Sequence, residues 1–190
     1  GLGDVYKRQI NGGFFKTRTK QAVAMGFIKT GGYRPAQIGA ETGVAVAVDT
    51  AGVLRLIDWS LAMEQADAPH RDRYPDVMVT GPMLLRGGRS LIPWDSTAPR
   101  HPRSCVGTKA DGTVLLMVVD GRQSRAAGMA LCELAYAARL MGAADAINLD
   151  GGGSSTLWTK GQGIVNAPSD RMLFFRSERP VCNAIVVKRK

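Results

Sequence analysis

The segment NLDGGGSST at 148–156 has the residues best suited to chemistry, because a carboxylate precedes three glycines and two hydroxyls. The apolar residues before Asp150 predict a buried strand that carries this side chain to its end. Glycine has no Cβ, so the N–H groups of 151–153 could approach a ligand and form an anion-binding nest. A tight turn in which Asp150 bonds only to its own backbone is the alternative.

VVDGR at 118–122 has a similar form, with a run of apolar residues that ends in Asp, Gly and a cation. Asp120 and Arg122 would lie on the same side of an extended chain, because alternate residues share a face. A surface turn with a solvated arginine is the plainer interpretation.

Two more segments place polar residues beside glycines or cations. NGGFF at 11–15 begins with Asn11, and HPRS at 101–104 puts His101 and Arg103 directly before an expected strand. A turn and a solvated loop are the plainer interpretations. If the strand ends at 11, 120 and 150 meet at one rim of a sheet, where ligands commonly bind, one cleft would hold Asn11, Asp120, Asp150 and Arg122.

Composition limits the kinds of partner. The 190 residues suit one domain, and the net charge of +9 favours anionic ligands, although a basic surface alone would look the same. Basic and aromatic residues do not interleave, so we expect no nucleic acid, and no apolar run is long enough for a membrane span. Cys132 and Cys182 are expected to be buried thiols, with one disulfide among the three cysteines as the alternative.

The elements that must position these residues are mostly strands. Hairpins are predicted for 43–49 with 53–59 and for 104–109 with 113–120, the second around the Asp111-Gly112 turn pair. A helix is predicted over 128–141, with Leu131, Leu134, Ala138 and Met141 on one face and Gly142 as its stop. Further strands are expected at 22–29, 77–80, 146–150, 155–158 and 181–188, and a short helix at 60–68.

We therefore predict a single α+β domain with a mixed or antiparallel sheet, one main helix and one or two short helices. Residues 1–9, GLGDVYKRQ, are unlike the rest of the chain and are interpreted as a non-native or remnant leader, which leaves 10–190 as the domain.

A family resemblance extends from about residue 10 to the end. The segments that carry it are NGGFF (11–15), GPMLLRGG (81–88), HPRS (101–104), VVDGR (118–122), GMALCELA (128–135), AINLDGGGSST (146–156) and RPVCNAIVV (179–187). In this order they resemble the motifs of phosphodiester glycosidase domains. Such domains usually have further strands upstream of NGGFF, so part of the fold could be missing.

The resemblance implies a hydrolase that cleaves the glycosidic bond of a sugar-1-phosphodiester. It implies a phosphorylated carbohydrate as substrate, a secreted or cell-envelope location and an exopolysaccharide context; it does not indicate an oligomeric state. A non-catalytic binding module for anionic polysaccharide is one alternative, and a phosphodiesterase that cuts the P–O bond is another.

By the same resemblance Asp120 and Asp150 are the catalytic carboxylates, without a division of roles between nucleophile, base and electrostatic stabiliser. The residues implied to bind substrate or phosphate are Asn11, Gly12, Gly13, Arg103, Arg122, Asn148, Gly151, Gly152, Gly153 and Ser154. The two guanidinium groups suit phosphate because each can donate two parallel hydrogen bonds. The resemblance specifies no cofactor, although the oxygens of Asp120, Asn148 and Asp150 could hold a divalent cation.

Overall fold

The computed structural model describes residues 6–18, 21–33, 37–38, 43–60, 73–172, 175–176 and 178–188 of the chain. The elements in chain order are β1 (Tyr6–Asn11), β2 (Phe15–Arg18), β3 (Gln21–Met25), β4 (Ile28–Lys29), β5 (Gln37–Ile38), β6 (Val44–Val48), β7 (Leu54–Asp58), β8 (Asp76–Thr80), β9 (Met83–Arg86), β10 (Arg89–Ser90), β11 (Arg103–Thr108), β12 (Val114–Val119), α1 (Leu131–Leu140), β13 (Asp145–Asn148), the 3₁₀ turn η3 (Gly152–Ser154), β14 (Leu157–Thr159), β15 (Gly163–Ile164), β16 (Arg171–Met172), β17 (Phe175–Arg176) and β18 (Ala184–Lys188).

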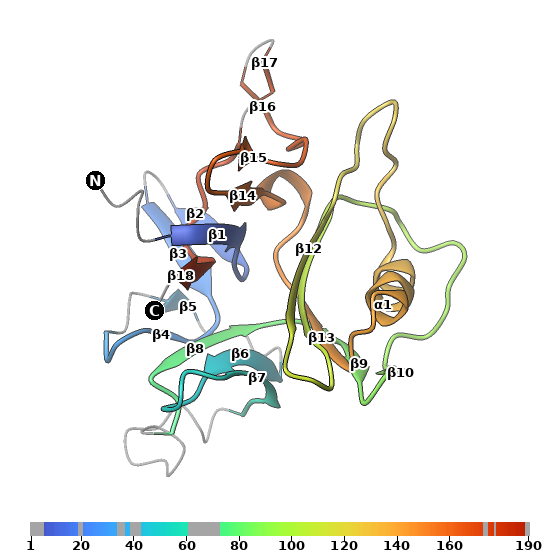
Figure 1. The fold of residues 1–190 in the computed structure, drawn as a ribbon. Coiled ribbons are helices and arrows are strands. Elements are labelled where there is room, and N and C mark those ends of the chain that lie inside the picture. Colours follow the sequence, from blue (N-terminus) through green and yellow to red (C-terminus); the bar gives the residue numbers. More distant parts are fainter. Residues whose placement is uncertain are drawn as a thin grey trace.

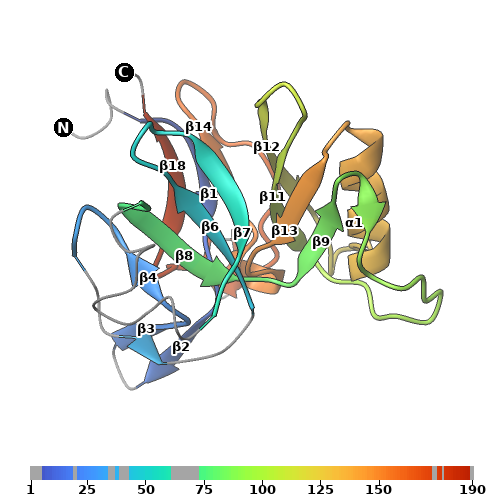
Figure 2. The same cartoon turned by 90° about the horizontal axis from the view of Figure 1, so that it is seen from below.

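Three sheets build the body of the molecule. Their strand orders are β10-β9-β13-β11-β12, β15-β14-β1-β18 and β4-β8-β6-β7, and all of their pairings are antiparallel. Two small sheets, β2-β3-β5 and β16-β17, complete the described part. Helix α1 covers one side of the five-stranded sheet, and the other large sheets lie on its opposite side (Figures 1 and 2).

The three central strands of the five-stranded sheet, β9, β13 and β11, are mostly buried, which explains their continuous apolar runs. Val106 and Ile147 face the large core, which Ile10 of β1 also enters. Their neighbours Cys105 and Ala146 face the opposite way and pack against α1. The strand that leads into Asp150 is therefore held from both sides.

The predicted fold class is wrong, because strands dominate the described residues and α1 is the one α-helix among them. A single ten-residue helix covers part of one sheet and does not make a separate helical layer. The predicted short helix at 60–68 lies almost wholly outside the described residues. No described helix has the length and apolar character needed to cross a membrane.

Helix α1 begins three residues later than predicted. Ala130 is its extended N-cap, and the Ala130 N–H donates to Glu133 Oε2 at 2.9 Å. The helix ends before Gly142, whose φ is +87° and whose N–H donates to Arg139 O at 2.9 Å, as the sequence indicates. Met141 was expected on the inner face, but it is 56% exposed, and Ala135 is buried instead.

Both predicted hairpins are confirmed, as β6-β7 and β11-β12. The expected strand at 22–29 is interrupted at Gly26, where φ is +123°, and forms β3 and β4. All three cysteines are free thiols; Cys105 and Cys132 are buried, whereas Cys182 is exposed, against expectation. Residues 6–9 of the segment interpreted as a remnant belong to β1 and pair with β14 and β18, while 1–5 lie outside the described residues.

We expect Ile147→Ala to lower the free energy of unfolding by about 2–5 kcal/mol, because it opens a cavity in the core between the sheets. Ile147 has no exposed surface. Leu140→Ala is the matched control, since Leu140 is 68% exposed on α1 and alanine favours helix. Urea unfolding of both variants measures the difference. If both variants lost the same small amount of unfolding free energy, the assignment of Ile147 to the core would be contradicted.

Candidate active site

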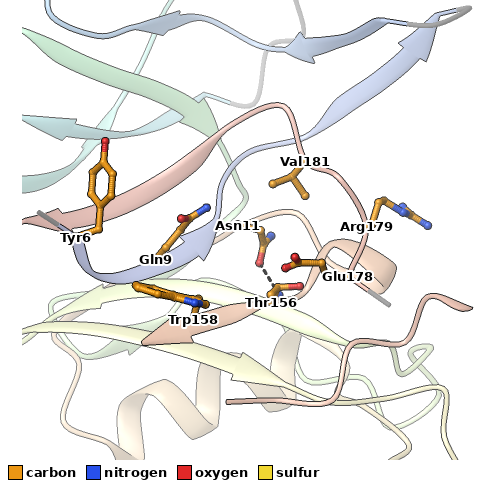
Figure 3. Close-up of a pocket in the computed structure, with 8 residues that line it drawn as sticks. All are labelled: Tyr6, Gln9, Asn11, Thr156, Trp158, Glu178, Arg179 and Val181. Carbon is orange, nitrogen blue, oxygen red and sulfur yellow. Dashed lines mark hydrogen bonds between the residues drawn. The ribbon is translucent and has the colours of Figure 1, made fainter. Parts of the chain in front are cut away.

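The side-chain amide of Asn11 joins three segments at the end of β1. Its Nδ2 donates to the Asp150 carbonyl oxygen at 2.6 Å, and its Oδ1 accepts from Ser104 Oγ at 2.7 Å and from the Thr156 N–H at 3.2 Å. Figure 3 shows the bond to Thr156. Asn11 is only 3% exposed, so these bonds satisfy an almost completely buried amide. The amide therefore fixes where the loop that carries Asp150 leaves its strand.

Gly12 and Gly13 use their polar groups inside the protein. Asp150 N donates to Gly12 O at 2.9 Å, and Gly13 N donates to Asn183 Oδ1 at 2.6 Å. A Cβ on Gly12 would overlap with Asn183 Oδ1, which accounts for the glycine. Gly12 thus packs closely against the segment before β18, whereas a Cβ on Gly13 would lie 3.2 Å from Val79 O of β8. Their predicted role in ligand binding stays a prediction.

Each glycine of the 151–153 turn faces a different neighbour. A Cβ on Gly151 would lie 2.8 Å from Pro102 O, and one on Gly152 would lie 3.1 Å from a guanidinium nitrogen of Arg122. A Cβ on Gly153 would overlap with the Asp170 carboxylate. Only Gly152 has a left-handed φ, at +62°. Close approach to backbone thus accounts for Gly151, and the left-handed conformation accounts for Gly152. Gly153 leaves room for the side chains of Asp170 and Arg179.

Two arginines and a histidine gather on one side of this turn. Arg122 adopts a φ of +55°, the only positive φ among the described non-glycine residues, and its guanidinium lies 3.3 Å from His101 Nδ1. Arg103 Nε donates to Met129 O at 2.9 Å. No carboxylate of the described residues forms an ion pair with either arginine. The cluster therefore carries uncompensated positive charge.

Burial and the neighbouring positive charges lower the pKa values of His101 and Arg103 in this cluster. Burial, and then the charges of Arg103 and Arg122, lower the pKa of His101, so its imidazole is neutral at neutral pH. Burial, and then the charge of Arg122, lower the pKa of Arg103. Because like charges are held together here, an incoming anion would relieve their repulsion.

Asp150 lies on the turn with a partly buried carboxylate. Burial raises its pKa, while the Ser154 hydroxyl, the Gly151 N–H and the charge of Arg179 lower it in part. Gly151 N donates to Asp150 Oδ1 at 2.9 Å. Arg179 is itself bound to Asp170 by two hydrogen bonds of 2.7 and 2.9 Å, and this pair covers Gly153.

Asp120 has a different setting. Its carboxylate accepts from Asn166 Nδ2 at 3.0 Å and from the Ala167 N–H at 3.0 and 3.1 Å. Asn166 Nδ2 also donates to Ser155 O at 3.0 Å, so Asp120 holds the 166–167 segment beside the glycine turn. The loop after Asp150 is thereby supported at a second point.

The three side chains suggested as ligands for a divalent cation, those of Asp120, Asn148 and Asp150, each make a hydrogen bond within the protein. Asn148 Nδ2 donates to Gly81 O at 3.0 Å, and its buried Oδ1 has no hydrogen-bond partner among the described residues. Within the described part of the chain, no three His, Cys, Asp or Glu side chains come together as a metal-binding group. A cation at Asp120, Asn148 and Asp150 stays a prediction.

A cavity of about 310 Å³ opens beside the Asn11 amide (Figure 3). Its lining residues are Tyr6, Gln9, Asn11, Thr156, Trp158, Glu178, Arg179 and Val181. Of the four residues predicted to share one cleft, only Asn11 lines this cavity. Arg122 and Asp120 reach the same loop elsewhere, at Gly152 and, through Asn166, at Ser155. The single-cleft arrangement stays a prediction.

Several site residues were missed from sequence. Arg179 and Asn183 belong to RPVCNAIVV, a segment that carried the family resemblance, but neither was selected as a site residue. Asp170 and Asn166 lie in a loop without regular pattern, and only the fold brings them to the turn. Trp158 follows the glycine motif by a few residues, and an aromatic side chain so close to the motif is the one signal that could have identified it.

We expect Asp150→Asn to raise the melting temperature at about pH 7 while removing activity. Folding raises the pKa of Asp150, so the ionised carboxylate destabilises the native state above that pKa and the protonated form does not. The gain should therefore shrink as the pH falls through the raised pKa of native Asp150, and it should be absent below the pKa of an unfolded aspartate, at about 3.9. Melting curves across this range measure it, and a variant less stable than wild type at neutral pH would contradict the account.

Comparison with known proteins identifies relatives of the whole described fold. The model of the phosphodiester glycosidase family matches residues 6–188. The catalytic domain of zebrafish N-acetylglucosamine-1-phosphodiester alpha-N-acetylglucosaminidase, auto-inhibited by its pro-peptide, superposes with a TM-score of 0.79 at 24% identity, over 97% of this chain and 64% of that chain. A Burkholderia pseudomallei protein described as exported superposes with a TM-score of 0.68 at 17% identity, over 96% and 65% of the two chains.

The curated protein that matches is the SPbeta prophage-derived uncharacterized protein YomE of Bacillus subtilis, which is 36% identical over 76 residues. The match covers 40% of this chain and 12% of that protein. The chain thus spans less than two thirds of each of these relatives. The structural matches establish the shared fold, and the family match extends over almost the entire sequence. The chain belongs to the phosphodiester glycosidase family.

Proposed function

We propose that this protein hydrolyses the glycosidic bond of a sugar-1-phosphodiester. The observation that carries the proposal is that one glycine turn adjoins both a partly buried carboxylate and an arginine cluster without an ion-pair partner among the described residues. Asp150 follows the buried strand on one side, and Arg122 lies against Gly152 on the other. Family membership supports this reaction class. The name of the zebrafish relative makes an N-acetylglucosamine phosphodiester the first substrate to test.

The arginine side suits the leaving group. Cleavage of the bond between the anomeric carbon and oxygen releases a phosphate monoester, which takes the electron pair of that bond. Such an anion departs with little protonation if its charge is stabilised where it develops. Arg122 has no ion-pair partner among the described residues, and the neutral His101 beside it can orient the guanidinium without adding charge. Arg122 is therefore assigned to the phosphate.

Asp150 is assigned to the anomeric carbon. A carboxylate there can stabilise the positive charge, attack the carbon, or accept a proton from the water that attacks it. A raised pKa makes Asp150 a better proton acceptor than an ordinary aspartate. Asp120, whose oxygens accept three hydrogen bonds from the 166–167 segment, is assigned to positioning that segment.

We also propose that the protein works outside the cytoplasm, on carbohydrate of the cell envelope or an exopolysaccharide. The basic net charge of +9 fits an anionic polymer, and a structural relative is described as exported. Fractionation of the native host followed by immunodetection tests this location, and a signal confined to the cytoplasm would contradict it.

A turnover screen tests the function. Alkyl 1-phosphodiesters of N-acetylglucosamine, glucose, galactose and mannose are incubated with wild type and with Asp150→Asn, and the free sugar is measured. We expect hydrolysis of at least one substrate by wild type and none above background by the variant. Binding of all four without turnover would instead indicate a non-catalytic module for anionic carbohydrate.

We expect Arg122→Ala to reduce kcat/KM for an alkyl phosphodiester by about 10²–10³, as for the loss of one oxyanion donor. An aryl phosphodiester leaves more easily and should be affected less, and Arg122→Lys should recover only part of the rate because it loses the two-pronged geometry. Arg125→Ala, which removes an exposed arginine three residues away, is the matched control. If Arg122→Ala slows both substrates equally and lowers the melting temperature, Arg122 is structural.

A further inference from the structure

The cavity beside Asn11 is not lined by the arginine cluster, but two of its lining residues interact with Asp150, directly before the 151–153 turn. Strand β1 contributes Tyr6, Gln9 and Asn11 to it, and the segment before β18 contributes Arg179 (Figure 3). Asn11 donates to the Asp150 carbonyl, and the charge of Arg179 acts on the Asp150 carboxylate. At about 310 Å³ the cavity falls at the small end of ligand pockets, a size suited to one ring and not to a long polymer.

Trp158 gives the cavity a free aromatic face. The other aromatic ring in the lining, Tyr6, already has Lys188 Nζ at 5.4 Å from its centroid. No ring or cation of the described residues stacks on Trp158. A partly exposed tryptophan in a concave site offers a flat apolar surface to the C–H face of a ring.

The polar groups around Trp158 are free to bind hydroxyls. The side chains of Gln9 and Glu178 make no hydrogen bond to any other described residue. Arg179 also lines the cavity, but it is already ion-paired with Asp170 through two hydrogen bonds. The lining therefore has one unpaired charge, the negative one of Glu178, which favours a neutral ring with hydroxyl donors and disfavours a phosphate.

We propose that this cavity is a binding site for a neutral pyranose, stacked on Trp158, with its hydroxyls bonded to Glu178 and Gln9. This inference rests on the proposed function, because it assigns the sugar and the phosphate of one substrate to opposite sides of the Asp150 turn. The sugar occupies the Trp158 side, and the phosphate occupies the Arg122 side. It also sets a specificity: uronic acids should bind less well than neutral sugars, since their carboxylate would face Glu178.

Titrations of the free sugars test the site without requiring turnover. N-acetylglucosamine, glucose and glucuronic acid are added to the ¹⁵N-labelled protein. The Trp158 indole N–H resonance is followed where it is present, and the backbone amide resonances of 156–159 are followed in every variant. The variants are Trp158→Ala, Glu178→Gln and the control Trp94→Ala, whose tryptophan is 67% exposed beside α1 and outside this cavity. Melting curves establish whether each variant is folded. If Trp158→Ala does not fold, the sugar affinity of Glu178→Gln tests the site instead.

We expect a neutral sugar to shift the Trp158 resonance and glucuronic acid to do so more weakly. Trp158→Ala and Glu178→Gln should each weaken binding of the neutral sugar roughly 3- to 10-fold, and Trp94→Ala should not change it. Turnover with unchanged sugar affinity in both cavity variants would overturn the inference and leave the proposed function intact. Trp158-dependent binding without any turnover would support the inference while the proposed function fails.

Discussion

The arrangement of the site depends on one buried amide. Asn11 is the last residue of β1, and its side chain bonds to Asp150, Ser104 and Thr156, which lie about a hundred residues or more away in sequence. Leaving such a group unpaired costs about 1–3 kcal/mol, so the sheet that contains β1 and the sheet that contains β11 have one favoured relative position. Because the bond to Asp150 is made by the backbone carbonyl, the carboxylate remains available for other contacts.

The glycine turn separates two kinds of environment that would interfere with one another if they were mixed. Arg122 and Arg103 make one side of the turn electropositive. On the other side Asp170 and Arg179 form an ion pair, and Glu178 contributes an unpaired negative charge to the cavity. Several features here oppose stability: the left-handed Arg122, the like charges of the arginines and the partly buried carboxylate of Asp150. Such costs are typical of functional sites, where local rules are broken for chemistry.

Local signals predicted much of this, and contacts between distant segments account for the rest. The Asp111-Gly112 hairpin and the Gly142 helix stop follow from backbone preferences of single residues. The importance of the 150–153 turn was also visible, since a strand, an acid and three glycines adjoin. In contrast, the Asp170–Arg179 pair could not be predicted, because it depends on the path of the last loop. Asp120 resembles Asp150 in its sequence context, but its carboxylate accepts hydrogen bonds from Asn166 and Ala167. Strand-rich segments with one clear helix indicated an α+β fold. The strands, however, assemble into several sheets, so one ten-residue helix is a small part of the described structure.

The site of bond cleavage tests the central claim most directly, because the account places Asp150 at the anomeric carbon and Arg122 at the departing phosphate. The hydrolysis of an N-acetylglucosamine 1-phosphodiester in ¹⁸O-labelled water, followed by mass spectrometry of both products at early times, identifies the atom that water attacks. The account predicts the label in the sugar and none in the phosphate monoester. A label in the phosphate would show cleavage of the P–O bond and would contradict the assignment of the two sides.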